Sequence, residues 1–227
     1  MAIKENLKTV RERINNAAKK AGRCPDEIKL IAVSKTKPLD MIFEAASCGV
    51  LDFGENRPQE LAEKFGKVEN ARWHLIGQLQ KNKVKYIIDK AELIHSVDSL
   101  GLAEEIEKRA AKINKIQNIL IQVNVSGEET KSGIAPEEAE MLIRKISEMP
   151  HIRIKGLMTI SVAGFDHNEN KKIFAGLREL AKEIDRLQIN NVSMGELSMG
   201  MTHDFEAAIE AGATMVRVGT GIFGTRN

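Results

Sequence analysis

The sequence predicts an α/β protein that forms a single closed (β/α)₈ barrel preceded by one extra N-terminal helix. Apolar runs of strand type alternate with segments of helical periodicity along the 227 residues. Several of the runs, such as residues 118–123, are almost continuously apolar, as expected of parallel strands that helices cover on both faces. Because barrels of this kind often reach 200 to 250 residues as one unit, we expect residues 1–227 to form a single domain.

The leading segment, residues 1–22, carries apolar side chains at helical spacing from residue 3 onward, and Gly22 is a natural helix stop. The weakest expected strand is the seventh, and an open, doubly wound sheet is the alternative architecture. No Gly-rich phosphate fingerprint follows the first strand, which disfavours that alternative. We expect strands near 28–35, 51–56, 71–77, 92–98, 118–124, 154–160, 191–195 and 215–220, and helices near 39–48, 57–66, 79–89, 99–114, 136–148, 168–188 and 203–211.

The overall composition argues against several classes of function. The chain has 34 basic and 32 acidic residues, so its net charge of +2 gives no reason to expect nucleic acid or a membrane surface as a partner. Cys24 and Cys48 are too few for a disulfide framework and lie in no zinc-type cluster, so we expect free thiols and no metal. Without an apolar signal core or a long apolar stretch, the protein is expected to be soluble and cytoplasmic.

The first strand ends in the segment Ser-Lys-Thr-Lys-Pro, residues 34–38, and brings a lysine to a strand exit. By the alternation of a strand, Lys35 shares a face with Val33, whereas Lys37 immediately precedes Pro38, where the chain should already be leaving the strand. Burial would lower the pKa of such an amine and leave it neutral, able to attack a carbonyl and form a Schiff base. The competing interpretation is that both lysines are solvated, and Lys37 is the second choice as nucleophile.

The exits of the last two strands carry the residues of a candidate phosphate site. In (β/α)₈ barrels, the loops after these strands recurrently bind phosphate through backbone N–H groups. Gly219 and Thr220 offer backbone N–H groups and a hydroxyl, and Ser198 offers a second hydroxyl, although a plain strand-to-helix turn would look the same. Together with Lys35 for an aldehyde and Arg217 for a ring nitrogen, these groups match what pyridoxal phosphate requires.

Other polar residues in the strands have simpler interpretations. His74 follows Trp73 in an apolar strand and is interpreted as a hydrogen-bonded core histidine rather than a proton shuttle. Met158 and Met199 are interpreted as filler of the core or pocket. The basic run at residues 81–85 is interpreted as a solvated helix face.

Eight segments, spread in order over about residues 28–224, resemble those of the pyridoxal phosphate homeostasis protein family: AVSKTKP, FGEN, WHLIGQLQKNK, HSVDS, NVSGEETKSGI, GLMTI, LSMGM and MVRVGTGIFG. That family is similar in fold to the barrel domain of alanine racemase. The resemblance implies that pyridoxal 5′-phosphate is the cofactor and that it is bound by Lys35 as a Schiff base, Arg217 at the pyridine nitrogen, Asn56 near the ring, and Ser198, Gly219 and Thr220 at the phosphate. The sequence departs from the family pattern at Arg57, where an aromatic residue is usual, at Thr202, where a serine is usual, and at Gly221, where an alanine is frequent.

The resemblance implies a protein that acts in cofactor homeostasis and supplies apo-enzymes, without a catalytic residue of its own. From its small size and expected solubility, we expect a monomer or weak dimer. A small racemase-like enzyme is the alternative, but it would need a second acid/base opposite the lysine. The single tyrosine, Tyr86, lies in an expected helix and is a poor candidate. A third possibility is a Schiff-base aldolase that takes a sugar phosphate, but a sugar gives no reason for Arg217.

Overall fold

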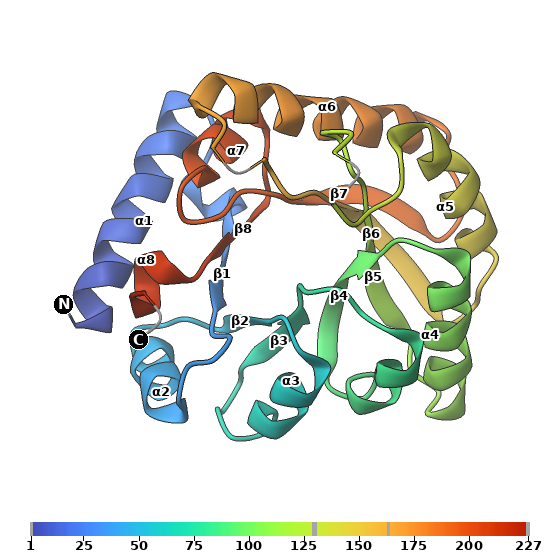
Figure 1. Ribbon diagram of the computed structural model, residues 1–227, viewed down its shortest axis with the longest axis horizontal. Coiled ribbons are helices and arrows are strands. Elements are labelled where there is room, and N and C mark those ends of the chain that lie inside the picture. Colours follow the sequence, from blue (N-terminus) through green and yellow to red (C-terminus); the bar gives the residue numbers. More distant parts are fainter. Residues whose placement is uncertain (1, 129–130, 163, 226–227) are drawn as a thin grey trace.

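The computed structural model describes residues 2–128, 131–162 and 164–225, in which eight parallel strands form a closed barrel in the order β1 to β8 (Figure 1). The predicted (β/α)₈ architecture with a leading helix is therefore confirmed. The strands are β1 (Lys29–Val33), β2 (Asp52–Glu55), β3 (Arg72–Leu75), β4 (Ala91–Val97), β5 (Gln117–Gln122), β6 (Ile152–Met158), β7 (Val192–Ser198) and β8 (Met215–Val218).

Helices surround the barrel, and short 3₁₀ turns accompany them. The α-helices are α1 (Ile3–Lys20), α2 (Leu39–Ser47), α3 (Pro58–Lys64), α4 (Leu100–Lys112), α5 (Ala139–Ser147), α6 (His167–Arg186), α7 (Phe205–Ala211) and α8 (Thr220–Phe223). The 3₁₀ turns are η1 (Pro25–Glu27), η2 (Lys81–Tyr86) and η3 (Pro136–Glu138).

The leading helix α1 lies against α2, α7 and α8 (Figure 1). Its apolar side chains repeat every three or four residues, so one face, which includes Leu7, Val10 and Ile14, is buried. The side-chain amide of Asn6 donates a hydrogen bond to the carbonyl of Ile222 at 2.8 Å. The helix therefore packs on the outside of the barrel and supports the short helix that follows β8.

Two expected elements differ from the structure. The helix expected over residues 79–89 is wrong, because this segment forms the 3₁₀ turn η2, in which Val84 is the one buried residue. Leu79, Ile87 and Ile88 of the expected helix are also buried, but they lie outside the turn, so within residues 81–86 only Val84 packs on the barrel. The short helix α8 was not expected, since four residues are too few to show a periodicity. The weak seventh strand, by contrast, is confirmed as β7.

The barrel interior is partly apolar and partly polar. A small cluster, separate from the core that lies under the helices, fills part of it with Ile31, Leu93, Leu120, Met158 and Met215. The buried side chains of His74, His95, Ser198 and Arg217 belong to the polar part. Met158 and Met199 are fully buried, as predicted for filler, and His74 is the hydrogen-bonded core histidine that was predicted.

The register of the strands brings three exits together. Ala32 of β1 pairs with Val218 of β8 on one side and with Phe53 of β2 on the other. The segments that follow these strands, beginning at Ser34, Gly219 and Asn56, therefore leave the barrel side by side at its carboxyl end. The candidate residues of three distant parts of the sequence meet here.

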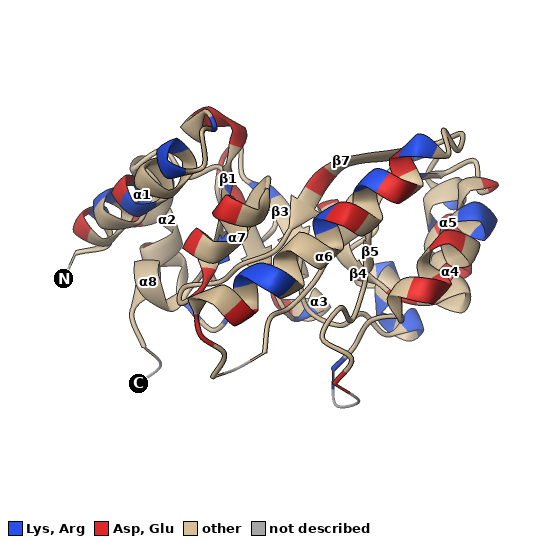
Figure 2. Cartoon of the chain, turned by 90° about the horizontal axis from the view of Figure 1, so that it is seen from above, with Lys and Arg blue, Asp and Glu red and all other residues tan. Residues whose placement is uncertain are grey.

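The outer surface shows no segregation of charge. Figure 2 shows basic and acidic residues interspersed along α1, α4, α5 and α6. Both cysteines are free thiols, as expected. In the described part of the chain, no helix is long and apolar enough to cross a membrane, and no cluster of His, Cys, Asp or Glu side chains could hold a metal ion.

Candidate functional site

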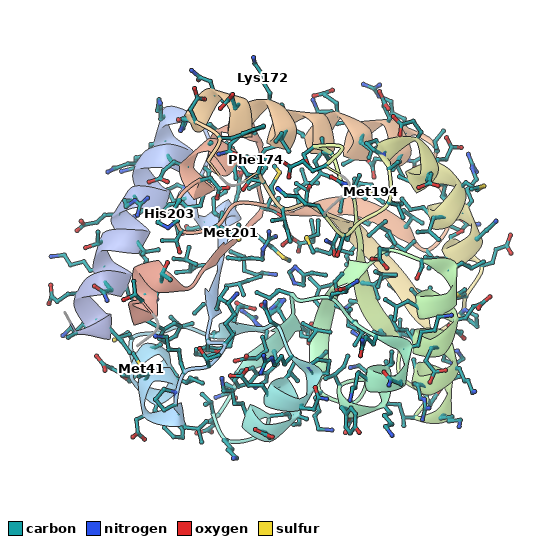
Figure 3. All side chains as sticks on the ribbon, in the orientation of Figure 1. Met41, Lys172, Phe174, Met194, Met201 and His203 are labelled. Atoms are coloured by element: carbon teal, nitrogen blue, oxygen red, sulfur yellow. The ribbon has the colours of Figure 1, made fainter. Side chains whose placement is uncertain are left out.

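A cavity of about 390 Å³ opens at the carboxyl ends of β1, β2 and β8. Its wall contains five of the six predicted binding residues: Lys35, Asn56, Arg217, Gly219 and Thr220. Val33, Ile76 and Ile160 form an apolar part of the wall, and Met201, Thr202 and His203 contribute from the loop after β7. Figure 3 shows Met201 and His203 on this loop, near the exit of β8. The arrangement places an amine, a guanidinium and a glycine turn around one space.

The backbone on both sides of Lys35 is held by side chains of α3. Lys64 donates from Nζ to the carbonyl of Ser34 at 2.8 Å, and the N–H of Thr36 donates to Oε1 of Glu60 at 2.6 Å. Thr36 adopts a left-handed conformation with φ of 62°, which is costly for a residue with a branched side chain. The two hydrogen bonds stabilise this turn and so orient the intervening lysine toward the cavity.

The amine of Lys64 is at the centre of a buried network of charges. It also contacts Oε1 of Glu55 at 2.8 Å and Oε1 of Glu60 at 2.7 Å, while the hydroxyl of Ser34 donates to Glu55 at 2.6 Å. Burial raises the pKa of Glu55, and the hydrogen bonds and charge of Lys64 offset this in part. The other oxygen, Oε2 of Glu55, has no hydrogen-bond partner among the described residues.

Sequence reasoning missed the parts that Glu60 and Lys64 play in this network. Both lie on an outer helix, where a Glu and a Lys four residues apart are usually a solvated pair. Here the pair faces the barrel, and the side chain of Lys64 is only 9% exposed. No local signal distinguishes the two cases, since the difference arises from the docking of α3 on β2.

The second lysine of the segment has another task. Lys37 donates from Nζ to the carbonyls of Phe223, Gly224 and Thr225, at 3.1, 3.3 and 3.2 Å. These carbonyls lie at and just after the C-terminal end of α8, where an ammonium is favourable. Lys37 therefore ties the first strand exit to the C-terminal segment, whereas the cavity wall contains Lys35.

Arg217 lies at the floor of the cavity and is 4% exposed. One terminal nitrogen, Nη1, donates to the hydroxyl of Ser198 at 2.6 Å, and the other, Nη2, donates to the carbonyl of Thr159 at 2.9 Å. Burial lowers the pKa of Arg217 to about 10, against the opposing effect of the carboxylate of Asp204. The guanidinium is therefore still a cation at neutral pH.

The structure does not place Ser198 where the sequence led us to expect it. Its side chain is fully buried, and its hydroxyl lies between Nη1 of Arg217 and Nδ1 of His95, at 2.6 and 2.8 Å. A strand residue that points into the barrel lies below the cavity, not in the loop above it. The loop residue on the wall is Thr202, whose Oγ1 accepts from the N–H of Gly221 at 3.4 Å. The departure from the family pattern at Thr202 was the signal that could have identified it.

The turn after β8 packs closely against its neighbours. A Cβ atom at Gly219 would lie 3.3 Å from both the Cβ and the carbonyl oxygen of Val33, and one at Gly221 would lie 3.1 Å from Thr202. The short helix α8 begins at Thr220, and the N–H groups of Gly221, Ile222 and Phe223 already donate to Thr202 and to the carbonyl of Gly219. Among the described residues, the backbone donors of this turn that face no such acceptor are those of Gly219 and Thr220. Donors of this kind, with the hydroxyls of Thr202 and Thr220, suit a phosphate group.

Asn56 reaches the cavity because Gly77 lets its backbone approach β3. A Cβ at Gly77 would lie 2.4 Å from the carbonyl oxygen of Asn56, closer than real Cβ contacts allow. The neighbouring Arg57 does not line this cavity but lines an adjacent opening together with Asn56. The unusual residue at position 57 therefore leaves the wall beside Lys35 unchanged.

Two further side chains concern possible proton transfer. Tyr86 lies in η2, is 36% exposed and contacts the amines of Lys83 and Lys85 through its ring, away from the cavity wall. His203, which sequence reasoning did not single out, lies at the exposed rim of the cavity. The titratable side chains on the described wall are thus those of Lys35, His203 and Arg217.

Fold and site together define a class of protein. The chain matches the family model of the alanine racemase N-terminal domain over residues 2–227. A solved alanine racemase of Clostridium difficile shares this fold with a TM-score of 0.75, at 17% identity, over 99% of this chain and 57% of that one.

Closer relatives narrow the class. A pyridoxal phosphate homeostasis protein of Aquifex aeolicus is 47% identical over 224 residues, 98% of this chain and 97% of that protein. The protein of the same description from Escherichia coli K12 is 40% identical over 231 residues, 99% of this chain and 97% of that protein. The structure of PipY from Synechococcus elongatus, with pyridoxal phosphate bound, has a TM-score of 0.85 at 34% identity, covering 98% of this chain and all of that one. The chain belongs to the pyridoxal phosphate homeostasis protein family.

Proposed function

We propose that this protein binds pyridoxal 5′-phosphate through Lys35 and acts in cofactor homeostasis, holding the cofactor and supplying it to apo-enzymes. The observation that carries the proposal is the cavity that has Lys35, Arg217 and the Gly219–Thr220 turn in one wall. The cofactor supplies an aldehyde that condenses with a lysine amine, with loss of water, to a Schiff base. The relatives described above are named for this homeostasis, and PipY has the cofactor bound.

The residues of the cavity fit the parts of the cofactor. Gly219, Thr220 and Thr202 would hold the phosphate, and Asn56 would lie near the ring. Arg217 would face the pyridine nitrogen. Because the pKa of this arginine, about 10, keeps it cationic, it disfavours protonation of a neighbouring ring nitrogen. An unprotonated ring withdraws electrons poorly, which suits carriage better than turnover.

A racemase-like activity remains a second candidate because of one observation. Such a reaction needs an acid/base in addition to the lysine, and His203 is a titratable group on the same wall. If the protein is a racemase, purified protein with added cofactor should interconvert L- and D-alanine, and His203→Ala should abolish that activity. We expect no interconversion above that of free cofactor.

The first test of the proposal is the absorption spectrum of the purified protein with added pyridoxal phosphate, followed by borohydride reduction and peptide mapping. Wild type should show a stable visible band, and the label should lie on Lys35. Lys35→Ala should lose both, whereas the matched variant Lys37→Ala should keep them, because the Lys37 amine contacts carbonyls outside the cavity. A label on Lys37, or a band unchanged by Lys35→Ala, would refute the proposal.

Arg217 distinguishes pyridoxal phosphate from a sugar phosphate, the substrate of the aldolase alternative. Arg217→Glu should weaken cofactor retention and shift the absorption band, because a carboxyl would favour a protonated ring nitrogen. A folded variant whose spectrum and affinity match those of wild type would remove Arg217 from the site.

A further inference from the structure

A continuous chain of hydrogen bonds crosses the barrel interior beneath the cavity. From Nη1 of Arg217 it passes to the hydroxyl of Ser198 (2.6 Å), to Nδ1 of His95 (2.8 Å), from Nε2 of His95 to Nδ1 of His74 (3.0 Å), and from Nε2 of His74 to Oδ1 of Asp52 (2.9 Å). Its members come from β8, β7, β4, β3 and β2. None of them except Arg217 lines the cavity.

The chain is buried along its length and ends near solvent at the opposite end of the barrel. Asp52, its last member, is 6% exposed and accepts two hydrogen bonds from Arg72, at 2.9 and 2.6 Å. The side chain of Arg72 is 49% exposed. Asp52 and Arg72 also line a small opening of about 200 Å³ at the amino ends of the strands.

Two members of the chain, Asp52 and His95, have a defined protonation state. Burial opposes ionisation of Asp52, but the hydrogen bonds from His74 and Arg72 and the charge of Arg72 outweigh it and hold the pKa of the carboxyl below its usual value. Burial, together with the positive charges of Arg217 and Lys29, holds the pKa of His95 well below the usual range of a histidine. Asp52 is therefore a carboxylate that can only accept, and His95 is neutral.

These states determine the direction of every hydrogen bond. Because Asp52 only accepts, His74 carries a proton on Nε2, and when His74 is neutral its Nδ1 accepts. His95 then donates from Nε2 to His74, and its own Nδ1 accepts from the hydroxyl of Ser198. The Ser198 oxygen has lone pairs left for Nη1 of Arg217. Each of the four hydrogen bonds in the chain then has one donor and one acceptor.

The opposite arrangement is unfavourable. A doubly protonated His74 would donate to His95, which would donate in turn to Ser198. The hydroxyl hydrogen of Ser198 would then have no acceptor among the contacts of the described residues. An unmade hydrogen bond in a buried site costs about 1–3 kcal/mol. An imidazolium would also add a cation to an interior that already holds Arg217.

We infer that this chain runs in one direction, from Arg217 to Asp52, and that Asp52, His74 and His95 are positioning residues that set the orientation of Arg217 through Ser198. The acceptor lone pair of Ser198 and the carbonyl of Thr159 hold the guanidinium at two points, leaving its other N–H groups for the cavity. The inference rests on the proposed function insofar as Arg217 meets the ring nitrogen. A carboxylate at one end of the barrel thereby orients the cofactor partner at the other.

The direct test is the tautomeric state of the two histidines in the cofactor-free protein. Long-range ¹H–¹⁵N spectra of ¹⁵N-histidine-labelled protein should show His74 and His95 both protonated on Nε2 alone at neutral pH. The protein has five histidines, so the signals of His151, His167 and His203 can be assigned from single Gln variants. Protonation of His95 on Nδ1, or an imidazolium signal from His74, would overturn the inference. This measurement requires no substitution of a residue in the hydrogen-bond chain.

A second test uses Asp52→Asn, whose side-chain amide can donate to His74 and reverse the chain. We expect a signal from His95 protonated on Nδ1 and, in the loaded protein, cofactor loss faster by about tenfold, a size typical of partners that orient a ligand-binding side chain. The matched control is Glu196→Gln, a carboxyl at the same barrel end that contacts Lys29 and Thr214. It should change neither readout.

The outcomes separate the inference from the proposed function. Unchanged tautomers and unchanged cofactor loss in a folded Asp52→Asn variant would overturn the inference, even if Lys35 binds the cofactor. If the histidines show the expected tautomers but the protein binds no cofactor, the direction of the hydrogen-bond chain is supported and the proposed function is refuted.

Discussion

The two sides of the cavity are built on opposite electrostatic principles. On the Lys35 side, the amine of Lys64 contacts the carboxylates of Glu55 and Glu60 directly, at 2.8 and 2.7 Å. On the Arg217 side, the guanidinium donates to the neutral groups Ser198 and Thr159. The carboxylate of Asp204 acts on it while hydrogen-bonded to Ser161 and Met201, and that of Asp52 lies at the far end of the barrel.

The difference follows from what each side must hold. The Lys35 side holds a strained backbone turn, and charge-assisted hydrogen bonds are the strong ones available for this. The Arg217 side holds a cation whose charge must act on a ligand. A carboxylate in direct contact would neutralise that charge, whereas a neutral chain orients the guanidinium and leaves its field in the cavity. Four measurements test this difference between the two sides of the cavity.

Lys64→Met should have the largest effect, because it leaves the carboxyl of Glu55 buried without its cationic partner. Breaking a buried ion pair from one side typically costs about 3–5 kcal/mol of unfolding free energy, measurable by urea denaturation. The exposed Lys108→Met should change stability by less than about 0.5 kcal/mol. A loss below about 1 kcal/mol in Lys64→Met would show that the charged network contributes little.

Ser198→Ala should cost less, because it removes a neutral group. The variant leaves Nδ1 of His95 and Nη1 of Arg217 without their partner, and unmade buried hydrogen bonds cost about 1–3 kcal/mol. The exposed Ser47→Ala is the matched control, expected within about 0.5 kcal/mol of wild type. A loss equal to that of Lys64→Met would contradict the difference between the two sides.

The two buried carboxyls should respond to pH with opposite signs. The folded pKa of Glu55 is raised above 4.5, so its stabilising contribution is largest below that value and is lost as the pH rises through the folded pKa. The folded pKa of Asp52 is lowered below 3.8, so its contribution is present above that value and is lost as the pH falls through the folded pKa.

Each unit of pKa shift corresponds to about 1.4 kcal/mol. Urea denaturation of wild type, Glu55→Gln and Asp52→Asn across the acid range measures this. The advantage of wild type over Glu55→Gln should shrink as the pH rises, and its advantage over Asp52→Asn should grow. Slopes of the same sign would mean that the two sides share one electrostatic design.

Lys37→Met should have the smallest effect. It removes an amine that contacts three exposed or half-buried carbonyls after α8, which water can satisfy in its place. We expect a loss of about 0.5–1.5 kcal/mol in unfolding free energy and no change in the site of borohydride labelling. Loss of the label from Lys35 in this variant would show that Lys37 belongs to the site.

Local pattern was sufficient for much of the fold and for part of the site. Alternation of apolar residues placed Ile31 in the barrel interior and Val33 and Lys35 at the cavity, since successive side chains of a strand point to opposite faces. The same reasoning places Gly219 and Thr220 at a strand exit. The reasoning from local pattern failed at η2, where a short basic segment has the sequence pattern of a solvated helix face but forms a 3₁₀ turn.

The sequence was therefore sufficient to predict the barrel, the family, and the lysine, arginine and glycine turn at the strand exits. Three further features became apparent only in the folded protein: Ser198 lies beneath Arg217, Thr202 takes its place on the wall, and α3 holds the backbone beside Lys35. The physical reason is separation along the chain: His95 and Ser198 are 103 residues apart, and their hydrogen bond exists because closure of the barrel sets the register between distant strands. Sequence periodicity predicts the face of the strand on which a side chain lies. The register of the closed barrel determines which other side chain it contacts on that face.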